Sequence, residues 1–201
     1  MKTLLSTKSV FLAASLLLLL TGCKSPYVEI TYTLSCSKNL LEYVVPVVTY
    51  KNDKGNTVTF NVPESEWEDA HNDTKVNTNV TNISENGEET TTESLSTSLL
   101  NWTKIVSYDD FTLVDDELTV RYQLKEGVTA DMLPSRILSS HQLTYFIELR
   151  DEDKTMHYKQ STDGITVGTA KVEDVLGAVD YRGFRIMNTG QIEEKMYKVN
   201  K

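Results

Sequence analysis

The sequence predicts a mainly β protein, folded as an antiparallel β-sandwich or a related barrel with one or two short helices. Two observations lead to this prediction. Apolar and polar residues alternate along Tyr27–Ser37, and about eight segments rich in β-branched and aromatic residues follow one another, separated by turn-forming residues. Helical patterns are scarce by comparison.

Tyr27–Ser37 is the clearest predicted strand, because its apolar residues recur at every second position. Cys36 continues this apolar face, and a buried cysteine usually behaves as a small hydrophobic residue. We therefore expect Cys36 in the core and not as a reactive thiol. The apolar residues that precede it are Val28, Ile30, Tyr32 and Leu34.

A β-hairpin is predicted from residues 44–50 and 57–62, which flank the turn-forming segment 52–56. Pro46 lies in the first arm and has no N–H to donate to a neighbouring strand. This residue therefore favours an edge position or a bulge.

Residues 72–98 are rich in Thr, Asn, Ser and Glu and contain few large apolar side chains. Asn86-Gly87 lies between two threonine-rich stretches and is a strong signal for a two-residue hairpin turn. The segment is predicted to be either a long polar hairpin or a mobile insertion, because it can bury little area by itself.

Short helical turns are predicted at residues 129–133, before Pro134, and at residues 171–176, before Gly177. Residues 191–199 fit a strand or a helix. The succession of short strands favours a sandwich of the immunoglobulin-like kind, or a related barrel. The remaining predicted strands are residues 99–108, 117–125, 143–150, 155–160 and 181–187.

The N-terminus has the pattern of an export signal, with Lys2 and Lys8 followed by an apolar run at residues 10–20. This run is shorter than the roughly 18 to 20 apolar residues that a membrane-spanning helix needs. It closes on Leu20-Thr21-Gly22-Cys23.

The segment Leu20-Thr21-Gly22-Cys23 resembles the lipobox of bacterial lipoproteins. The resemblance implies that the Cys23 thiol is lipidated, that the chain is cleaved after Gly22, and that the new amine is acylated. It predicts a cleaved signal peptide at residues 1–22, a lipidated tether at 23–26 and a single β-rich domain at 27–201. Two or three acyl chains would make membrane attachment effectively permanent.

In overall plan the chain resembles the short envelope lipoproteins common in Gram-negative anaerobes. The resemblance implies a place in the bacterial cell envelope, on the outer membrane, and it leaves the leaflet and the facing direction open. Only Cys36 remains once Cys23 carries lipid, so no intrachain disulfide is expected.

The net charge of −9 describes an acidic chain. Such a surface repels nucleic acid and anionic lipid head groups, so no nucleic-acid partner is predicted. The acyl chains at Cys23, and not charge, are expected to provide the membrane contact.

The motifs of common catalytic sites are absent from the sequence. Gly-x-Ser-x-Gly is missing, and no spacing links His71, His141 or His157 to a partner, so each histidine is expected on a surface or a strand face. Neither glycine-rich phosphate loops nor paired Cys and His ligands for zinc occur. We therefore predict no catalytic residue, no cofactor and no metal.

The acidic runs at residues 109–110, 115–117 and 151–153 are interpreted as solvated turns. Calcium is the alternative, because carboxylate oxygens are its ligands, although none of the runs follows the twelve-residue calcium loop.

Trp67 is the one candidate for ligand contact. Acidic residues surround it and no strand pattern draws it inward, which favours a surface ring able to stack on a glycan or a peptide. The alternative is a lid that folds back over the end of the sandwich. Trp102 lies among aliphatic residues and is expected in the core.

These observations favour a lipid-anchored envelope protein that acts as a non-enzymatic binding or assembly module, with a protein or a glycan as partner. An exposed edge strand would permit strand addition. The alternatives are an envelope glycan-processing enzyme with a carboxylate site, and a structural subunit that self-associates through a sheet edge.

Overall fold

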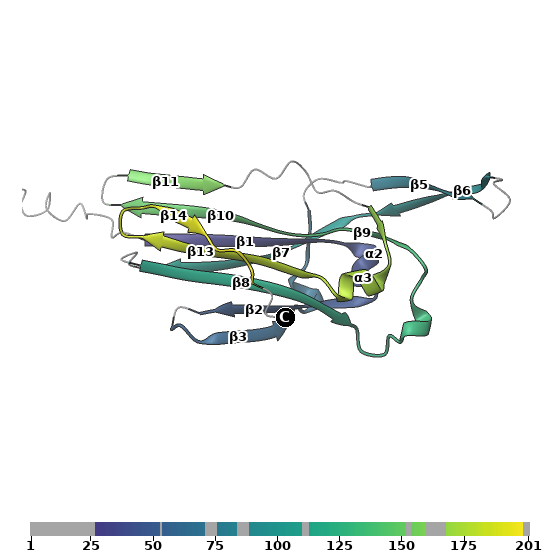
Figure 1. The fold of residues 1–201 in the computed structure, drawn as a ribbon, viewed down its shortest axis with the longest axis horizontal. Helices are drawn as coiled ribbons and strands as arrows, with labels where there is room; N and C mark the ends of the chain where they lie inside the picture. The colour runs from purple at the N-terminus through teal and green to yellow at the C-terminus, as the bar shows by residue number, and fades with distance from the viewer. Residues whose placement is uncertain are drawn as a thin grey trace, which may run out of the picture.

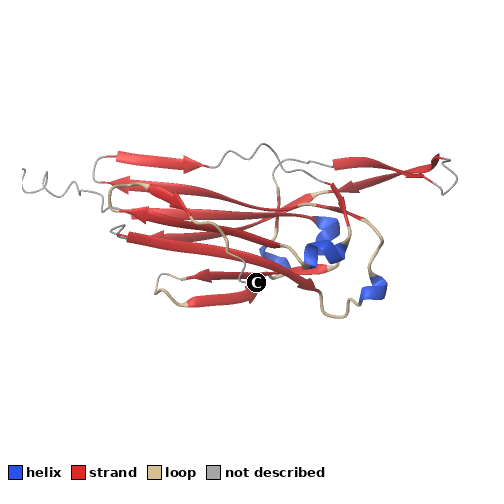
Figure 2. Cartoon of the chain, in the orientation of Figure 1, coloured by secondary structure: helices blue, strands red, loops and turns tan. Residues whose placement is uncertain are grey.

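The computed structural model describes residues 27–52, 54–70, 76–83, 89–109, 113–151, 154–159 and 168–198. In these ranges the chain is an antiparallel β-sandwich with two short α-helices, as Figures 1 and 2 show. The predicted fold class is therefore confirmed. No helix in the described ranges is long and apolar enough to cross a membrane.

The first sheet contains the strand with the clearest sequence pattern. Its order is β11 (Lys154–Lys159), β10 (His141–Asp151), β1 (Tyr27–Ser37), β7 (Leu99–Tyr108) and β4 (Glu68–Asp69). The second sheet has the order β14 (Ile192–Glu194), β13 (Val179–Met187), β8 (Leu113–Leu124), β2 (Val44–Lys51) and β3 (Thr57–Asn61).

Smaller elements surround the two sheets. The helices are α2 (Lys38–Leu41) and α3 (Val172–Leu176), and the 3-10 turns are η1 (Glu64–Glu66) and η2 (Ala130–Met132). Two further pairs of strands are β9 (Ile137–Ser139) with β12 (Gly168–Ala170), and β5 (Val76–Ile83) with β6 (Glu89–Thr97).

The strand order is immunoglobulin-like at its centre. β1 pairs with β7 in one sheet and β2 pairs with β8 in the other, as strands B and E and strands C and F do in that fold. β10 lies on the other side of β1, where the first strand of an immunoglobulin-like domain would lie. The outer position is thus filled by a strand from late in the chain.

The core lies between the sheets and follows the alternation of β1. Five inward residues of this strand, including Cys36, have an exposed fraction of 0%. Trp102 of β7 is 2% exposed. Cys36 and Trp102 therefore lie in the core, as predicted. Burial raises the pKa of the Cys36 thiol, which keeps it protonated. The other four fully buried inward residues of β1 are Val28, Ile30, Tyr32 and Leu34.

Most predicted elements are confirmed, with boundary shifts. The predicted turns at 129–133 and 171–176 are η2 and α3, and the ambiguous segment 191–199 contains the short strand β14. Within residues 72–98, β5 and β6 pair as antiparallel strands, while the predicted turn at Asn86-Gly87 lies outside the described residues. α2 follows β1 directly and was not predicted.

The prediction for Pro46 was wrong. β2 is not an edge strand, because it lies between β8 and β3, and the pairing shows no bulge at this residue. The Pro46 carbonyl accepts the Val62 N–H, and the N and the carbonyl of a strand residue point to the same side. The missing donor therefore faces β3 at the point where the β2–β3 ladder ends.

β1 runs from one end of the sandwich to the other. Its first residue, Tyr27, lies at one end of the sandwich, and its last residue leads into α2 at the opposite end (Figure 1). The paired strands β5 and β6 extend beyond this second end (Figure 1). We call it the distal end, because it lies farthest from Tyr27.

Candidate functional site

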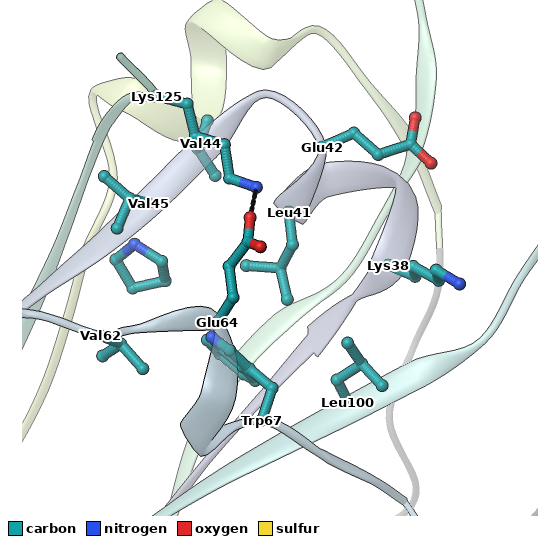
Figure 3. A pocket seen from close by; sticks show the side chains of 11 residues that line it. Lys38, Leu41, Glu42, Val44, Val45, Val62, Glu64, Trp67, Leu100 and Lys125 are labelled. Atoms are coloured by element: carbon teal, nitrogen blue, oxygen red, sulfur yellow. Dashed lines mark hydrogen bonds and ion pairs between the residues drawn. The ribbon is translucent and has the colours of Figure 1, made fainter.

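An apolar pocket of about 280 Å³ lies near the distal end and is called the Trp67 pocket. It forms where α2, the start of β2 and the segment after β3 meet (Figure 3). Aliphatic side chains and the Trp67 ring make most of its lining, and four charged residues complete it. The lining residues are Lys38, Leu41, Glu42, Val44, Val45, Pro46, Val62, Glu64, Trp67, Leu100 and Lys125.

Trp67 lies on the crossover that connects β3 in one sheet to β4 in the other. Its indole is half-buried and packs against the core, while the acidic residues on either side of it in the chain are exposed. The structure therefore places the ring between the two expectations: it covers core residues, as a lid would, and it also lines a pocket. Those exposed neighbours are Glu64, Glu66, Glu68 and Asp69.

Two polar contacts hold this crossover in place. Lys125, at the end of β8, donates to the Glu64 carboxylate, and this ion pair lies across the pocket in Figure 3. The hydrogen bond from Lys125 holds the pKa of Glu64 below its usual range. On the other side, the Trp102 indole N–H donates to Glu66 Oε2 at 2.8 Å. The buried Trp102 thus helps to position the segment that carries Trp67.

The charged side chains of the pocket are either paired or directed outward. Glu64 is paired with Lys125, whereas Lys38 and Glu42 of the α2 region extend away from the centre of the pocket in Figure 3. The interior consists of aliphatic groups and one aromatic ring. Such a lining removes apolar ligand surface from water but offers few partners for ligand hydroxyl groups.

Asp116 corrects the interpretation of residues 115–117 as a solvated turn. This residue lies in β8 and has an exposed fraction of 0%. Its carboxylate accepts hydrogen bonds from the Tyr32 hydroxyl, at 2.6 Å, and from the Tyr108 hydroxyl. Burial raises the Asp116 pKa, and the hydrogen bonds from the two tyrosines oppose that rise. β8 begins at Leu113, four residues before the predicted start at Glu117.

A second polar cluster ties the two sheets together on the β10 side. His141 Nδ1 of β10 lies 2.8 Å from Asp180 Oδ2 of β13. The Tyr122 hydroxyl of β8 donates to the same Asp180 oxygen, and the thiol of Cys36 lies within hydrogen-bond contact of Tyr122. His141 is therefore a strand residue with a carboxylate partner, which no spacing in the sequence indicated.

The His141 cluster has the parts of a carboxylate-oriented base but not those of a nucleophilic site. An aspartate that accepts from Nδ1 leaves Nε2 as the free ring nitrogen. A pocket of about 250 Å³ lies beside the ring and is lined by His141, Ser139, Ser140 and Asp174, among others. The Cys36 thiol is fully buried and protonated, so it cannot act as the nucleophile.

The remaining sequence candidates stay apart from both pockets or lie outside the described residues. Cys23 and His71 fall outside the described ranges, as do parts of the acidic runs at 109–110 and 151–153. His157 lies in β11. In the part of the chain that the structure describes, no group of three or more His, Cys, Asp or Glu side chains could hold a metal ion.

The sequence contained a signal for only one of the two groups that were missed. Asp116 continues the inward positions Val114, Leu118 and Val120, so the alternation of β8 indicates burial despite the charge. For the Trp67 pocket no local signal exists, because its walls come from segments that meet only in the folded chain.

Comparison with family models, with curated proteins and with solved structures finds no match to this chain.

Proposed function

We propose that this chain is a lipid-anchored protein of the bacterial envelope that binds an apolar side chain of a peptide partner in the Trp67 pocket. The observation that carries the proposal is an apolar pocket of about 280 Å³ with a half-buried tryptophan in its wall. This volume lies near the lower end of the roughly 300 to 1,000 Å³ typical of small-molecule sites, which suits one large side chain.

The lining favours a peptide over a glycan. Sugar hydroxyls placed against Leu41, Val44, Val62 and Leu100 would lose hydrogen bonds to water without replacement. An apolar side chain gains free energy from the same surfaces, and Trp67 adds a flat ring for contact. The charges on the rim can contact the polar backbone of the peptide.

The proposed anchor would leave the pocket accessible to a partner. If Cys23 carries the lipid, only Lys24, Ser25 and Pro26 separate the anchor from β1. β1 has 11 residues and spans about 35 Å at roughly 3.3 Å per residue. The Trp67 pocket, near the other end of β1, is then presented away from the membrane, where a partner can reach it.

The test is a titration monitored by the Trp67 indole N–H in nuclear magnetic resonance spectra of the lipidated protein in detergent micelles. The probes are capped tripeptide amides with Leu, Phe or Ser at the centre, and the trisaccharide of N-acetylglucosamine. Leu and Phe peptides should shift the Trp67 signal, whereas the Ser peptide and the sugar should not. A shift with the sugar alone would reject the peptide proposal in favour of a glycan.

The matched control uses the second tryptophan of the chain. Trp102 is buried and its indole N–H is bonded to Glu66, so its signal should move little in the same titrations. Trp67→Phe assigns the two signals, because only the Trp67 signal disappears.

A further inference from the structure

The edge strands of the two main sheets differ in their protection against pairing. Sheet edges expose unpaired backbone groups, and proteins usually protect them with charged residues, proline, bulges or short length. β11 begins and ends with lysine, β14 contains two glutamates, and β4 is a Glu-Asp pair only two residues long. β3 has the sequence Thr-Val-Thr-Phe-Asn and carries neither a charge nor a proline.

The register identifies which β3 backbone groups are free. The Asn56 carbonyl accepts the Asn52 N–H, and the Val62 N–H donates to the Pro46 carbonyl, so residues of even number face β2. The backbone groups of Thr57, Thr59 and Asn61 therefore point away from the sheet. In the described part of the chain no strand lies beyond β3.

The opposite sheet also has an uncovered edge on this side, but that edge is protected. β4 pairs only with Leu100 and Asn101, so the rest of β7 lacks an outer neighbour among the described residues. Lys104 of this stretch lies with its Nζ 4.4 Å from the centre of the Tyr50 ring. A lysine turned over the core in this way is a device that blocks strand pairing. β3 has no such residue.

We propose that β3 is a strand-addition site for an extended segment of another polypeptide. The side chains of β3 define its chemistry. Val58 and Phe60 face the core but stay half-buried, because one flank is open, and Phe60 packs against the core. Thr57, Thr59 and Asn61 are exposed on the other face. The matching partner is an uncharged strand that alternates apolar and hydroxyl side chains, with its apolar residues beside Val58 and Phe60.

A second copy of this chain is a poorer occupant than a different polypeptide. Antiparallel pairing of two β3 strands would place the two β1 strands in opposite directions. Two copies anchored through Cys23 in one membrane must point the same way, because the tether is only three residues long. The site is separate from the Trp67 pocket, so either proposal can fail without the other.

The test measures amide hydrogen exchange by nuclear magnetic resonance on the lipidated protein in detergent micelles. The probe is a capped peptide of alternating threonine and valine. Without peptide, the Thr57, Thr59 and Asn61 amides should exchange freely. Peptide at saturation should slow them by about tenfold or more and leave the Val58 and Phe60 amides unchanged, since these already face β2. No slowing up to the solubility limit of the peptide overturns the proposal.

Two substitutions at Thr59 test the same edge in different ways. Thr59→Pro removes an outward N–H and Thr59→Lys adds a charge at an exposed position, so both should weaken peptide binding about tenfold or more. Both variants should stay folded, with only a small drop in melting temperature from loss of the exposed hydrogen bond between the Thr49 and Thr59 hydroxyls. Thr103→Pro on the β7 edge is the matched control and should bind normally. Unchanged binding by both Thr59 variants overturns the proposal, as does a concentration-dependent dimer that Thr59→Pro dissolves, because the occupant would then be a second copy.

Discussion

Asp116 shows how one residue can connect the two sheets through polar groups in an apolar interior. Its carboxylate accepts from Tyr32 of the first sheet and from Tyr108 at the end of β7, so the buried oxygens are satisfied. Removing water from a carboxylate nevertheless disfavours its charged form, and the pKa of Asp116 is raised. The native state thus binds a proton here more readily than the unfolded chain.

The first prediction concerns the pH dependence of this buried carboxyl. Because the Asp116 pKa is higher in the folded state, its contribution to stability is present at low pH and is lost as pH rises through the folded pKa. The difference in unfolding free energy between the wild type and Asp116→Asn should therefore decrease from pH 4 toward neutrality. Urea unfolding across that range measures the difference. A constant difference would show that the folded and unfolded pKa values are equal.

The second prediction concerns Trp67. Its ring is half-buried, so Trp67→Ala should cost about 1 to 3 kcal/mol of unfolding free energy, less than the roughly 3 to 5 kcal/mol of a fully buried aromatic residue. Trp102→Ala, at a position 2% exposed, is the matched control and should reach the larger cost. Chemical denaturation compares them. An unchanged stability for Trp67→Ala would mean that the ring makes no contribution to the core.

Single residues could be predicted where their position in a strand decides their environment. Cys36 and Trp102 were placed in the core because the alternation of β1 and the aliphatic neighbours in β7 indicated it. Asp116 also lies at an inward position of a strand, but it was predicted in a solvated turn because it is charged. The hydroxyls that make its burial tolerable come from Tyr32 and Tyr108, which precede Asp116 by 84 and 8 residues in the sequence, so no local pattern reveals them.

At the scale of elements, the boundaries of strands were predicted better than their positions in the sheets. β7 has the predicted boundaries, because its composition alone distinguishes it. α2 was missed because four residues are too few to show a helical period. The sequence shows that Pro46 has no N–H to donate, but it does not show which neighbouring strand loses that hydrogen bond. For this reason Pro46 was predicted at a sheet edge or a bulge. The pairing of β2 resolves this, since only the β3 side loses a bond.

The C-terminal segment packs on the outer face of the second sheet through a close approach at Gly183. Lys195 forms ion pairs with Asp115 and Glu117, and Tyr181 contacts Tyr197 with ring centres 5.1 Å apart. A Cβ added at Gly183 would lie 2.7 Å from Cζ of Tyr181 and 3.0 Å from Cε of Lys195. Absence of a side chain at Gly183 therefore lets this segment reach the sheet.

The third prediction follows from that contact. Gly183→Ala should displace the Tyr181 ring and loosen residues 195–198 without opening the core. Amide exchange in β14 and after it should accelerate, while the amides of β1 and β7 stay protected. Acceleration in β1 to the same degree would show that the substitution unfolds the whole sandwich and that the tail has no separate stability. Gly168→Ala is the control, because a Cβ there meets no atom within 4 Å.

At the scale of the whole molecule, the fold class could be predicted because many short strands with one apolar face have few ways to bury it. The order of the strands could not. β10 pairs with β1 across more than one hundred residues of sequence, and such long-range pairing leaves no local trace. The Trp67 pocket depends on the same long-range packing, which explains why the sequence indicated the tryptophan but not the cavity beside it.

The fourth prediction addresses the proposed anchor. Cys23→Ser should abolish incorporation of labelled palmitate and leave the chain at the size of the uncleaved precursor, since serine has no sulfur to form the thioether. Cys36→Ser is the matched control and should be lipidated normally, because Cys36 is buried in the folded domain. Labelled lipid on the Cys23→Ser chain would reject the lipoprotein assignment.

The last prediction tests the orientation of the molecule on the membrane. Leu113 is 61% exposed and begins β8 just after β7 ends at Tyr108, which pairs beside Val28 of β1, so it lies at the end nearest the proposed anchor. Lys38 begins α2 at the distal end. A fluorescent label on Leu113→Cys should be quenched by lipids that carry a quencher in their head groups, whereas the same label on Lys38→Cys should not. Both variants can keep Cys36, since its buried, protonated thiol should not react with the label.

The expected contrast follows from distance. The two labelled positions are separated by nearly the length of β1, about 35 Å at roughly 3.3 Å per residue, whereas contact quenching requires the label to touch the head groups. Equal quenching at both positions would mean that the sandwich lies flat on the bilayer, and strong quenching at Lys38→Cys alone would mean that it is inverted. Either result would remove the argument that the anchor presents the Trp67 pocket to a partner, and inversion would place the pocket against the membrane.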